Sequence, residues 1–124
     1  MKSIKQLRSA GRIRQILSDV LLTEVSDPRL FGITITDVKI DRELRHASIY
    51  VGALGSDVRE RDVMDGLSSA RGYLRRQVAM RLQARVTPDL NFIWDPTLAR
   101  AQRIESLFED IEIPPEESVI DAEE

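Results

Sequence analysis

Apolar residues recur at spacings of three and four from Val63 to Leu82, a pattern that predicts one face of a long helix packed on a core. The segment Ser68-Ser69-Ala70-Arg71-Gly72 lies in the middle of this stretch. Glycine inside a helix costs about 1 kcal/mol relative to alanine, and serine can hydrogen-bond to the backbone in competition with the helix. Because the apolar spacing continues through the segment, we expect residues 57–88 to form two helices joined end to end at a kink.

The charge of the chain changes at the same point. No acidic residue lies between Gly66 and Pro88, whereas five arginines do, namely Arg71, Arg75, Arg76, Arg81 and Arg85. A second helix that begins here would present free backbone N–H groups beside arginines, and such an arrangement binds phosphate. The alternative is structural, because arginines often form a solvated helix face and a glycine often only lets a neighbouring element pack closely.

The net charge of −3 hides an uneven distribution along the 124 residues. Nine of the 21 acidic residues and none of the 18 basic residues lie at or beyond Glu105, so residues 1–103 carry 18 bases and 12 acids, a net charge of +6. A basic body favours a polyanionic partner. We expect residues 1–111 to form a single domain and residues 112–124, which are acidic and lack a packing pattern, to be a disordered tail.

The inventory of reactive side chains is poor. The chain has no cysteine, which excludes disulfides, thiolate catalysis and zinc–thiolate sites, and its single histidine, His46, begins a strand among charged residues. Two carboxylate pairs could hold the magnesium of a hydrolase, although polar runs of this kind are usually only solvated surface. These pairs are Asp41 with Glu43 and Asp62 with Asp65. We therefore expect no enzyme, no catalytic or metal site and no cofactor.

Local patterns predict the other elements. We expect a helix over about 5–25, strands over 32–41, 47–53 and 90–94, and a last helix that begins at Asp95-Pro96 and ends near Asp110. The inward residues of the first strand change from odd to even numbers, which predicts a β-bulge near Thr36–Asp37. Asp57 and Glu60 have the spacing of a capping box for the helical pair.

The predicted order is α-β-β-α-α-β, followed by a C-terminal helix. A short charged turn joins the first two strands, which are therefore expected to be antiparallel. The second and third strands are joined through the helical pair, so they can lie parallel through a right-handed crossover. A three-stranded sheet with its helices on one face makes a two-layer α+β domain.

Six local matches, in order over about residues 8–110, resemble the ribosome-binding factor A family. They are Arg12-Ile13 with its helix, the segment 25–30, Ile35-Thr36-Asp37-Val38, the alternating segment 44–51, the Ala70-Arg71-Gly72 junction with Tyr73-Leu74-Arg75, and the segment 88–95. The resemblance implies a type II KH-like fold in which a helix-kink-helix replaces the Gly-x-x-Gly loop. It also implies a non-enzymatic factor that binds the immature small (30S) ribosomal subunit and contacts its ribosomal RNA, assisting RNA processing and folding. The acidic end lies outside the shared pattern.

The candidate RNA-binding residues centre on the junction. We expect phosphate contacts from Arg71, Arg75 and Arg76, with the backbone at Gly72 free to approach RNA closely. Ser69 and Ala70 complete the junction. Weaker candidates are Arg12 and Arg14 in the basic first helix, and Lys39 and Arg45 near the strand turn, where acidic residues are interleaved. Tyr73 could stack on a base, although packing on the sheet is its more common role.

Two other binding functions remain open from the sequence. The acidic tail with Val119-Ile120 fits a protein-interaction module whose partner is a ribosomal protein or another factor. A DNA-binding helical pair is disfavoured, because no three- or four-residue turn separates the two helices. No run of about 18 apolar residues is present, so we expect no membrane span, and we expect a monomer in the cytoplasm.

Overall fold

The computed structural model of the chain describes residues 3–53 and 59–100. Several predictions concern residues outside these ranges. Asp57 of the expected capping box, most of the predicted last helix and the acidic tail all lie outside the described residues.

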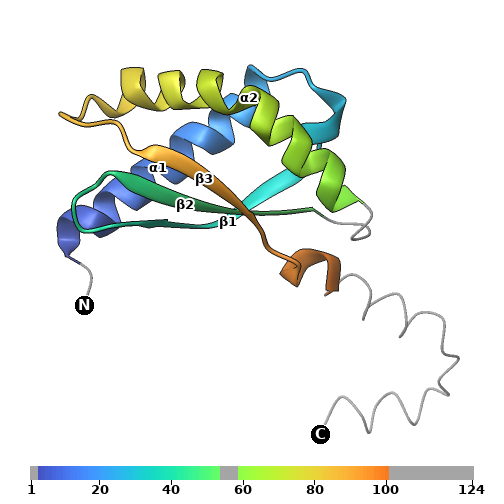
Figure 1. The fold of residues 1–124 in the computed structure, drawn as a ribbon, viewed down its shortest axis with the longest axis horizontal. Helices are drawn as coiled ribbons and strands as arrows, with labels where there is room; N and C mark the ends of the chain where they lie inside the picture. Colours follow the sequence, from blue (N-terminus) through green and yellow to red (C-terminus); the bar gives the residue numbers. More distant parts are fainter. Residues whose placement is uncertain (1–2, 54–58, 101–124) are drawn as a thin grey trace, which may run out of the picture.

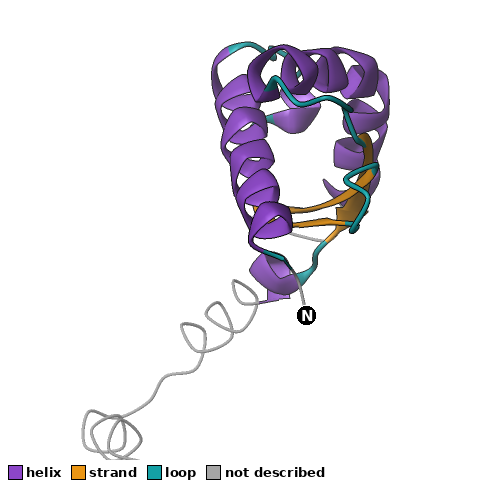
Figure 2. Ribbon diagram, turned by 90° about the vertical axis from the view of Figure 1, so that its left-hand side faces the viewer, coloured by secondary structure: helices purple, strands orange, loops and turns teal. Residues whose placement is uncertain are grey.

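The described residues form two layers, with both long helices on one face of a three-stranded sheet (Figure 1). The turned view separates the helical layer from the strands (Figure 2). The elements are α1 (Ile4–Thr23), the 3-10 helix η1 (Pro28–Leu30), β1 (Ile33–Ile40), β2 (His46–Ala53), α2 (Arg59–Leu82) and β3 (Asp89–Trp94). The predicted α+β architecture is confirmed, with one long helix between β2 and β3 where two were expected.

The sheet has the order β1-β2-β3, with β1 antiparallel and β3 parallel to β2, as predicted. The predicted bulge is also confirmed, because the register of β1 against β2 shifts between Ile35 and Asp37. The shift keeps both Ile35 and Val38 buried, and the extra residue, Thr36, donates its hydroxyl to Asp95 Oδ2 at 2.6 Å. The bulge therefore keeps the apolar residues on both sides of it directed toward the core, and it also joins β1 to the residue that follows β3.

α1 begins with a capping box that the sequence patterns had not indicated. Ser3 Oγ accepts from the backbone N–H of Gln6, and Gln6 Oε1 accepts from the backbone N–H of Ser3. The amide of Gln6 also donates to the carbonyl of Ile40 at 3.1 Å, so it joins the helix start to the end of β1. The basic first turns of α1 are thereby anchored to the sheet.

α2 is one continuous helix of 24 residues, so the predicted division into two helices is wrong. Figure 1 nevertheless shows its axis changing direction near the middle, between the green and yellow halves. The apolar stripe continues across this point, because Leu67 and Leu74 are both fully buried. Burying such side chains contributes roughly 1.5–3 kcal/mol each, which outweighs the cost of about 1 kcal/mol for Gly72. No helix begins at the bend, so the free backbone N–H groups that were expected there do not occur at that point, because only the first turn of a helix has them.

Asp95 starts the next helical turn, as predicted. Its Oδ1 accepts from the backbone N–H and the hydroxyl of Thr97 at 3.0 and 2.6 Å, and residues 97–100 are helical. The hydroxyl of Thr36, followed by that of Thr97, holds the pKa of Asp95 below its usual range. Within the described residues, neither long helix combines the length and apolar composition needed to cross a membrane.

Gly66 provides a test of how closely α2 packs on η1. A Cβ at this position would lie 2.9 Å from Leu30 Cδ2 and 3.3 Å from Arg29 Cβ, whereas a Cβ at Gly72 would meet nothing within 4 Å. Overpacking costs roughly 1–3 kcal/mol, and alanine gains about 1 kcal/mol over glycine in a helix. We expect Gly66→Ala to lower the free energy of unfolding by about 1 kcal/mol, measured by denaturant titration. The matched control Gly72→Ala should raise it by about the same amount. Stabilisation by both substitutions would contradict the packing.

Candidate nucleic-acid interface

The residues of α2 divide among four faces, because side chains three and four apart share a side of a helix. The core face is buried, the second faces α1, the third lines a groove beside β3, and the fourth points to solvent. The solvent face carries three of the predicted residues, Ser69, Gly72 and Arg76, all exposed. The predicted junction residues therefore do not point in one direction. Ala70 is half-buried and packs against the core.

A small groove lies between α2 and the edge strand β3. It has a volume of about 140 Å³ and is lined by Met64, Ser68, Arg71, Leu90, Asn91 and Phe92. Leu90 and Phe92 supply an apolar floor, whereas Ser68, Arg71 and Asn91 supply hydrogen-bonding groups. A nucleobase has the matching chemistry, with an apolar face and a polar edge. Arg71 is exposed at this groove and, within the described residues, has no ion-pair partner.

Arg75 is partly engaged in holding β3 to α2. Its Nη2 donates to the carbonyl of Thr87 at 3.0 Å, and its Nε lies 3.4 Å from Asp89 Oδ1. The Arg75 side chain is still 47% exposed. Arg76, by contrast, has no ion-pair partner in the described part of the chain. The phosphate contacts predicted for these arginines stay predictions, and Arg71 and Arg76 are the better placed of the three.

Two of the weaker candidates, Arg12 and Arg45, lie at one end of the molecule, near the last turn of α2 and the start of β3. Arg12 Nη2 donates to the carbonyl of Arg81 at 2.8 Å, which joins α1 to the last turn of α2. The carbonyl of Arg45 accepts from the backbone N–H of Asp89 at 2.8 Å, so the turn between β1 and β2 adjoins the start of β3. Figure 1 places the first half of α1, this turn and the end of α2 at its left-hand side. Basic residues from three elements therefore meet at one end of the fold.

The other two weaker candidates lie elsewhere. Arg14 lines a groove between α1 and β1, at the opposite edge of the sheet from β3. The ammonium group of Lys39 lies 5.3 Å from the ring centre of Tyr50, and both residues are on the sheet face away from the helices. The ten predicted residues thus do not form one continuous patch.

A cluster of Glu24, Tyr73 and Arg81 joins α1 to α2, and sequence reasoning missed it. The hydroxyl of Tyr73 donates to Glu24 Oε1 at 2.7 Å, and Arg81 pairs with Glu24 Oε2. The ring of Tyr73 is half-buried against the core, and its hydroxyl is hydrogen-bonded to Glu24. Both parts of this side chain therefore stabilise the fold. The only sequence signal was that Glu24 follows Val20 and Leu21 by four and three residues, which places it on the apolar face of the first helix. Ser68 and Asn91 in the groove were also missed, although Ser68 lies three residues before Arg71 on one helix face.

One of the four carboxylates considered as metal ligands, Asp41, has structural partners. Asp41 Oδ1 accepts from the backbone N–H groups of Arg45 and His46 at 2.7 and 3.1 Å, which closes the turn between β1 and β2. The N–H of His46, followed by that of Arg45, lowers the pKa of Asp41. Among the described residues, no three side chains of the metal-binding types lie close enough together to hold an ion.

Glu24 makes the contact between the helices dependent on pH. The hydrogen bond from Tyr73, and after it the one from Arg81, lowers the pKa of Glu24. A carboxylate with a lowered pKa in the folded state stabilises the fold above its unfolded pKa, about 4.3, and this contribution is lost as the pH falls through the folded value. We expect Glu24→Gln to lower the melting temperature at pH 7 and to match the parent chain at the acid end. Tyr73→Phe should give an intermediate curve, and a difference independent of pH would contradict the assignment.

The sequence matches a known family along most of its length. Residues 5–108 match the family model of ribosome-binding factor A. Ribosome-binding factor A of Halorhodospira halophila is 38% identical over 109 residues, which are 87% of this chain and 86% of that protein. The protein of the same name from Halothermothrix orenii is 34% identical over 124 residues, which are 100% of this chain and 99% of that protein.

Solved structures agree with the sequence match. The crystal structure of ribosome-binding factor A from Thermus thermophilus aligns with a TM-score of 0.65 at 26% identity, covering 72% of this chain and 93% of that one. A homology model of the Thermus thermophilus factor, fitted into a cryo-EM map of its 30S complex, shares the fold with a TM-score of 0.57 at 24% identity over 77% of this chain and 97% of that one. The expected KH-like fold is thereby confirmed. By its sequence over residues 5–108, this chain belongs to the ribosome-binding factor A family.

Proposed function

We propose that this chain binds the immature small ribosomal subunit, contacts its ribosomal RNA and assists the processing and folding of that RNA. Membership of the ribosome-binding factor A family supports the partner, and the Thermus thermophilus factor has been described in a complex with the 30S subunit. The function needs binding alone, so the chain acts without a catalytic step or a cofactor. It works as a monomer in the cytoplasm.

The observation that most directly supports an RNA contact is the exposed position of Arg71 at the groove between α2 and β3. No acidic residue lies between Asp65 and Asp89, so the positive potential along the second half of α2 is not offset from within the helix. Ser68 and Asn91 can hold the polar edge of a base, while Arg71 at the groove and Arg76 on the solvent face contact phosphates. Contacts of this kind recognise shape and backbone more than sequence.

Gly72 has a specific part in this interface. It is exposed on the solvent face of α2 between Ser69 and Arg76, and a side chain there would meet no protein atom within 4 Å. The fold itself therefore does not require glycine at this position, and alanine would favour the helix. A ribose–phosphate chain that runs along the bend requires the missing side chain, because a Cβ would hold it away from the helix backbone.

The release of the factor follows from a difference in affinity between two states of the subunit. A protein that binds the immature arrangement of the RNA more tightly stabilises that arrangement and dissociates when the mature one forms. In this proposal residues 1–111 are the RNA-binding domain and residues 112–124 are an acidic tail. The tail as a docking segment for a ribosomal protein is the second candidate function, and its truncation tests it separately.

The salt dependence of binding tests the arginine contacts. We expect the parent chain to co-sediment with small and not with large subunits, and its affinity to fall steeply with added KCl. Each phosphate contact removed should lower the slope of log K against log salt by roughly 0.7–0.9, so Arg71→Ala with Arg76→Ala should lower it by about 1.5. The matched control is Arg61→Ala, an exposed arginine in the first half of the same helix. An equal effect of the control, or salt-independent binding, would overturn the proposed interface.

Gly72→Ala separates stability from binding. If RNA passes close to the bend, this substitution should weaken binding to small subunits at least about tenfold, which corresponds to about 1.4 kcal/mol, while the melting temperature rises. The measurement is a titration of labelled protein with small subunits, alongside thermal unfolding. The matched control is Gly11→Ala in α1, because it also adds a Cβ at an exposed helix position where nothing lies within 4 Å, but outside the proposed interface. Unchanged affinity for the Gly72 variant would show that RNA does not approach this point.

A further inference from the structure

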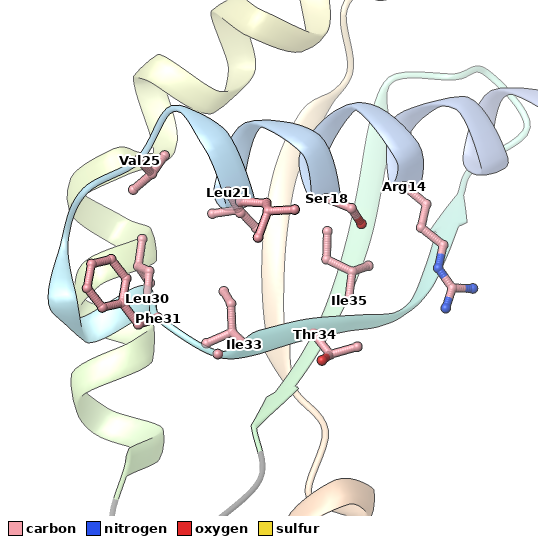
Figure 3. A pocket seen from close by; sticks show the side chains of 11 residues that line it. Arg14, Ser18, Leu21, Val25, Leu30, Phe31, Ile33, Thr34 and Ile35 are labelled. Carbon is pink, nitrogen blue, oxygen red and sulfur yellow. The ribbon is translucent and has the colours of Figure 1, made fainter.

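A second groove lies between the last turns of α1 and the start of β1 (Figure 3). Its volume is about 560 Å³. The lining is mostly apolar, and Arg14 is the one charged side chain among the described residues that form it. Figure 3 shows Leu21 of α1 facing Ile33 and Ile35 of β1 across this groove, with Arg14 at one end and Phe31 at the other. It therefore suits an apolar segment that carries negative charge.

Two features show that the groove is open to a partner. Leu22 and Phe31 at its rim are 83% and 58% exposed, which is unusual for large apolar side chains gathered around one groove. The sheet order also places β1 at an edge, so within residues 3–53 and 59–100 no strand pairs with its outer side. An apolar groove beside a free strand edge is the arrangement that accepts an added extended segment.

We propose that residues 111–113 of this same chain dock into the groove as an extended segment beside β1. The sequence Ile111-Glu112-Ile113 alternates apolar and acidic residues, so in an extended chain both isoleucines enter the groove while Glu112 faces solvent. The segment lies among the nine acids that follow Arg103, and the groove presents the positive charge of Arg14 to them. Pro114 and Pro115 end the segment, since proline cannot extend a strand ladder.

The described chain ends close enough for this segment to reach. Leu98 lies 3.4 Å from where a Cβ on Gly52 would be, and Gly52 pairs with Thr34, which lines the groove. Leu98 is therefore about one strand spacing, roughly 5 Å, from the edge strand, on the sheet face away from the helices, so the segment reaches the groove around the outer side of β1. Residues 101–110 span roughly 15 Å as the predicted helix and up to roughly 33 Å when extended, and both lengths exceed the strand spacing between Leu98 and β1.

Docking at this edge would keep the acidic tail away from the proposed RNA interface. The groove adjoins β1, whereas Arg71 lies beside β3 at the opposite edge of the sheet. Nine carboxylates free to reach the arginines of α2 would compete with RNA for them. Holding the segment 111–113 at β1 reduces that competition.

Engineered cysteines can test this docking without background, because the chain has no cysteine. The test variant carries Leu22→Cys and Ile113→Cys in the full chain. We expect it to form a disulfide within one molecule at least about tenfold faster than the control, since a disulfide requires the two Cα atoms to approach within roughly 7 Å. The matched control carries Met80→Cys and Ile113→Cys, because Met80 is also an exposed apolar residue, 64% exposed on α2.

Three outcomes would overturn the proposal. Equal rates in the two variants would mean that the tail has no preferred position, and a disulfide-linked dimer would mean that the groove takes a second copy. The third outcome concerns hydrogen exchange at the amides of residues 33–35 in a chain carrying Ile111→Ser and Ile113→Ser. We expect exchange there to accelerate, and unchanged rates would exclude docking. None of these measurements involves RNA, so their failure would leave the proposed function unaffected.

Discussion

The burial of one apolar stripe of α2 against the sheet governs the rest of this structure. Val63, Leu67, Leu74 and Val78 are all fully buried, and together they span the weak segment in the middle of the helix. With roughly 1.5–3 kcal/mol from each side chain, this contact sustains a continuous helix through two serines and a glycine. The stripe also fixes the rotation of α2, and the rotation decides which arginines face solvent.

Contacts around this stripe set the position of α2 relative to its neighbours. Arg75 reaches Thr87 and Asp89 at the start of β3, whereas the cluster of Glu24, Tyr73 and Arg81 joins the second half of the helix to α1. Exposed ion pairs of this kind contribute little individually, so their role is orientation more than stability. They leave Arg71 and Arg76 on the outer part of the helix, where a polyanion can reach them.

The two edges of the sheet differ in chemistry. The β3 edge adjoins a helix without acidic residues beyond Asp65 and carries a groove with polar groups over an apolar floor. The β1 edge adjoins α1 and carries a larger, mostly apolar groove. A bulge at Thr36 connects them, because its hydroxyl reaches Asp95, where the chain leaves β3. One small domain thus has the proposed RNA interface at one edge and the proposed docking groove at the other.

The sequence by itself determined the strands, the bulge, the parallel crossover and the helix start at Asp95, because alternation, proline positions and turn residues are local signals. It also determined the family, through short matches that occur in order along the chain. It could not decide whether α2 was one helix or two, since the cost of glycine is local but the burial that offsets it depends on the sheet. It also grouped Arg14 and Lys39 with the junction arginines, which the fold places on other surfaces. Only the tertiary structure decided these points, because the direction of a side chain depends on how its element is rotated against the core.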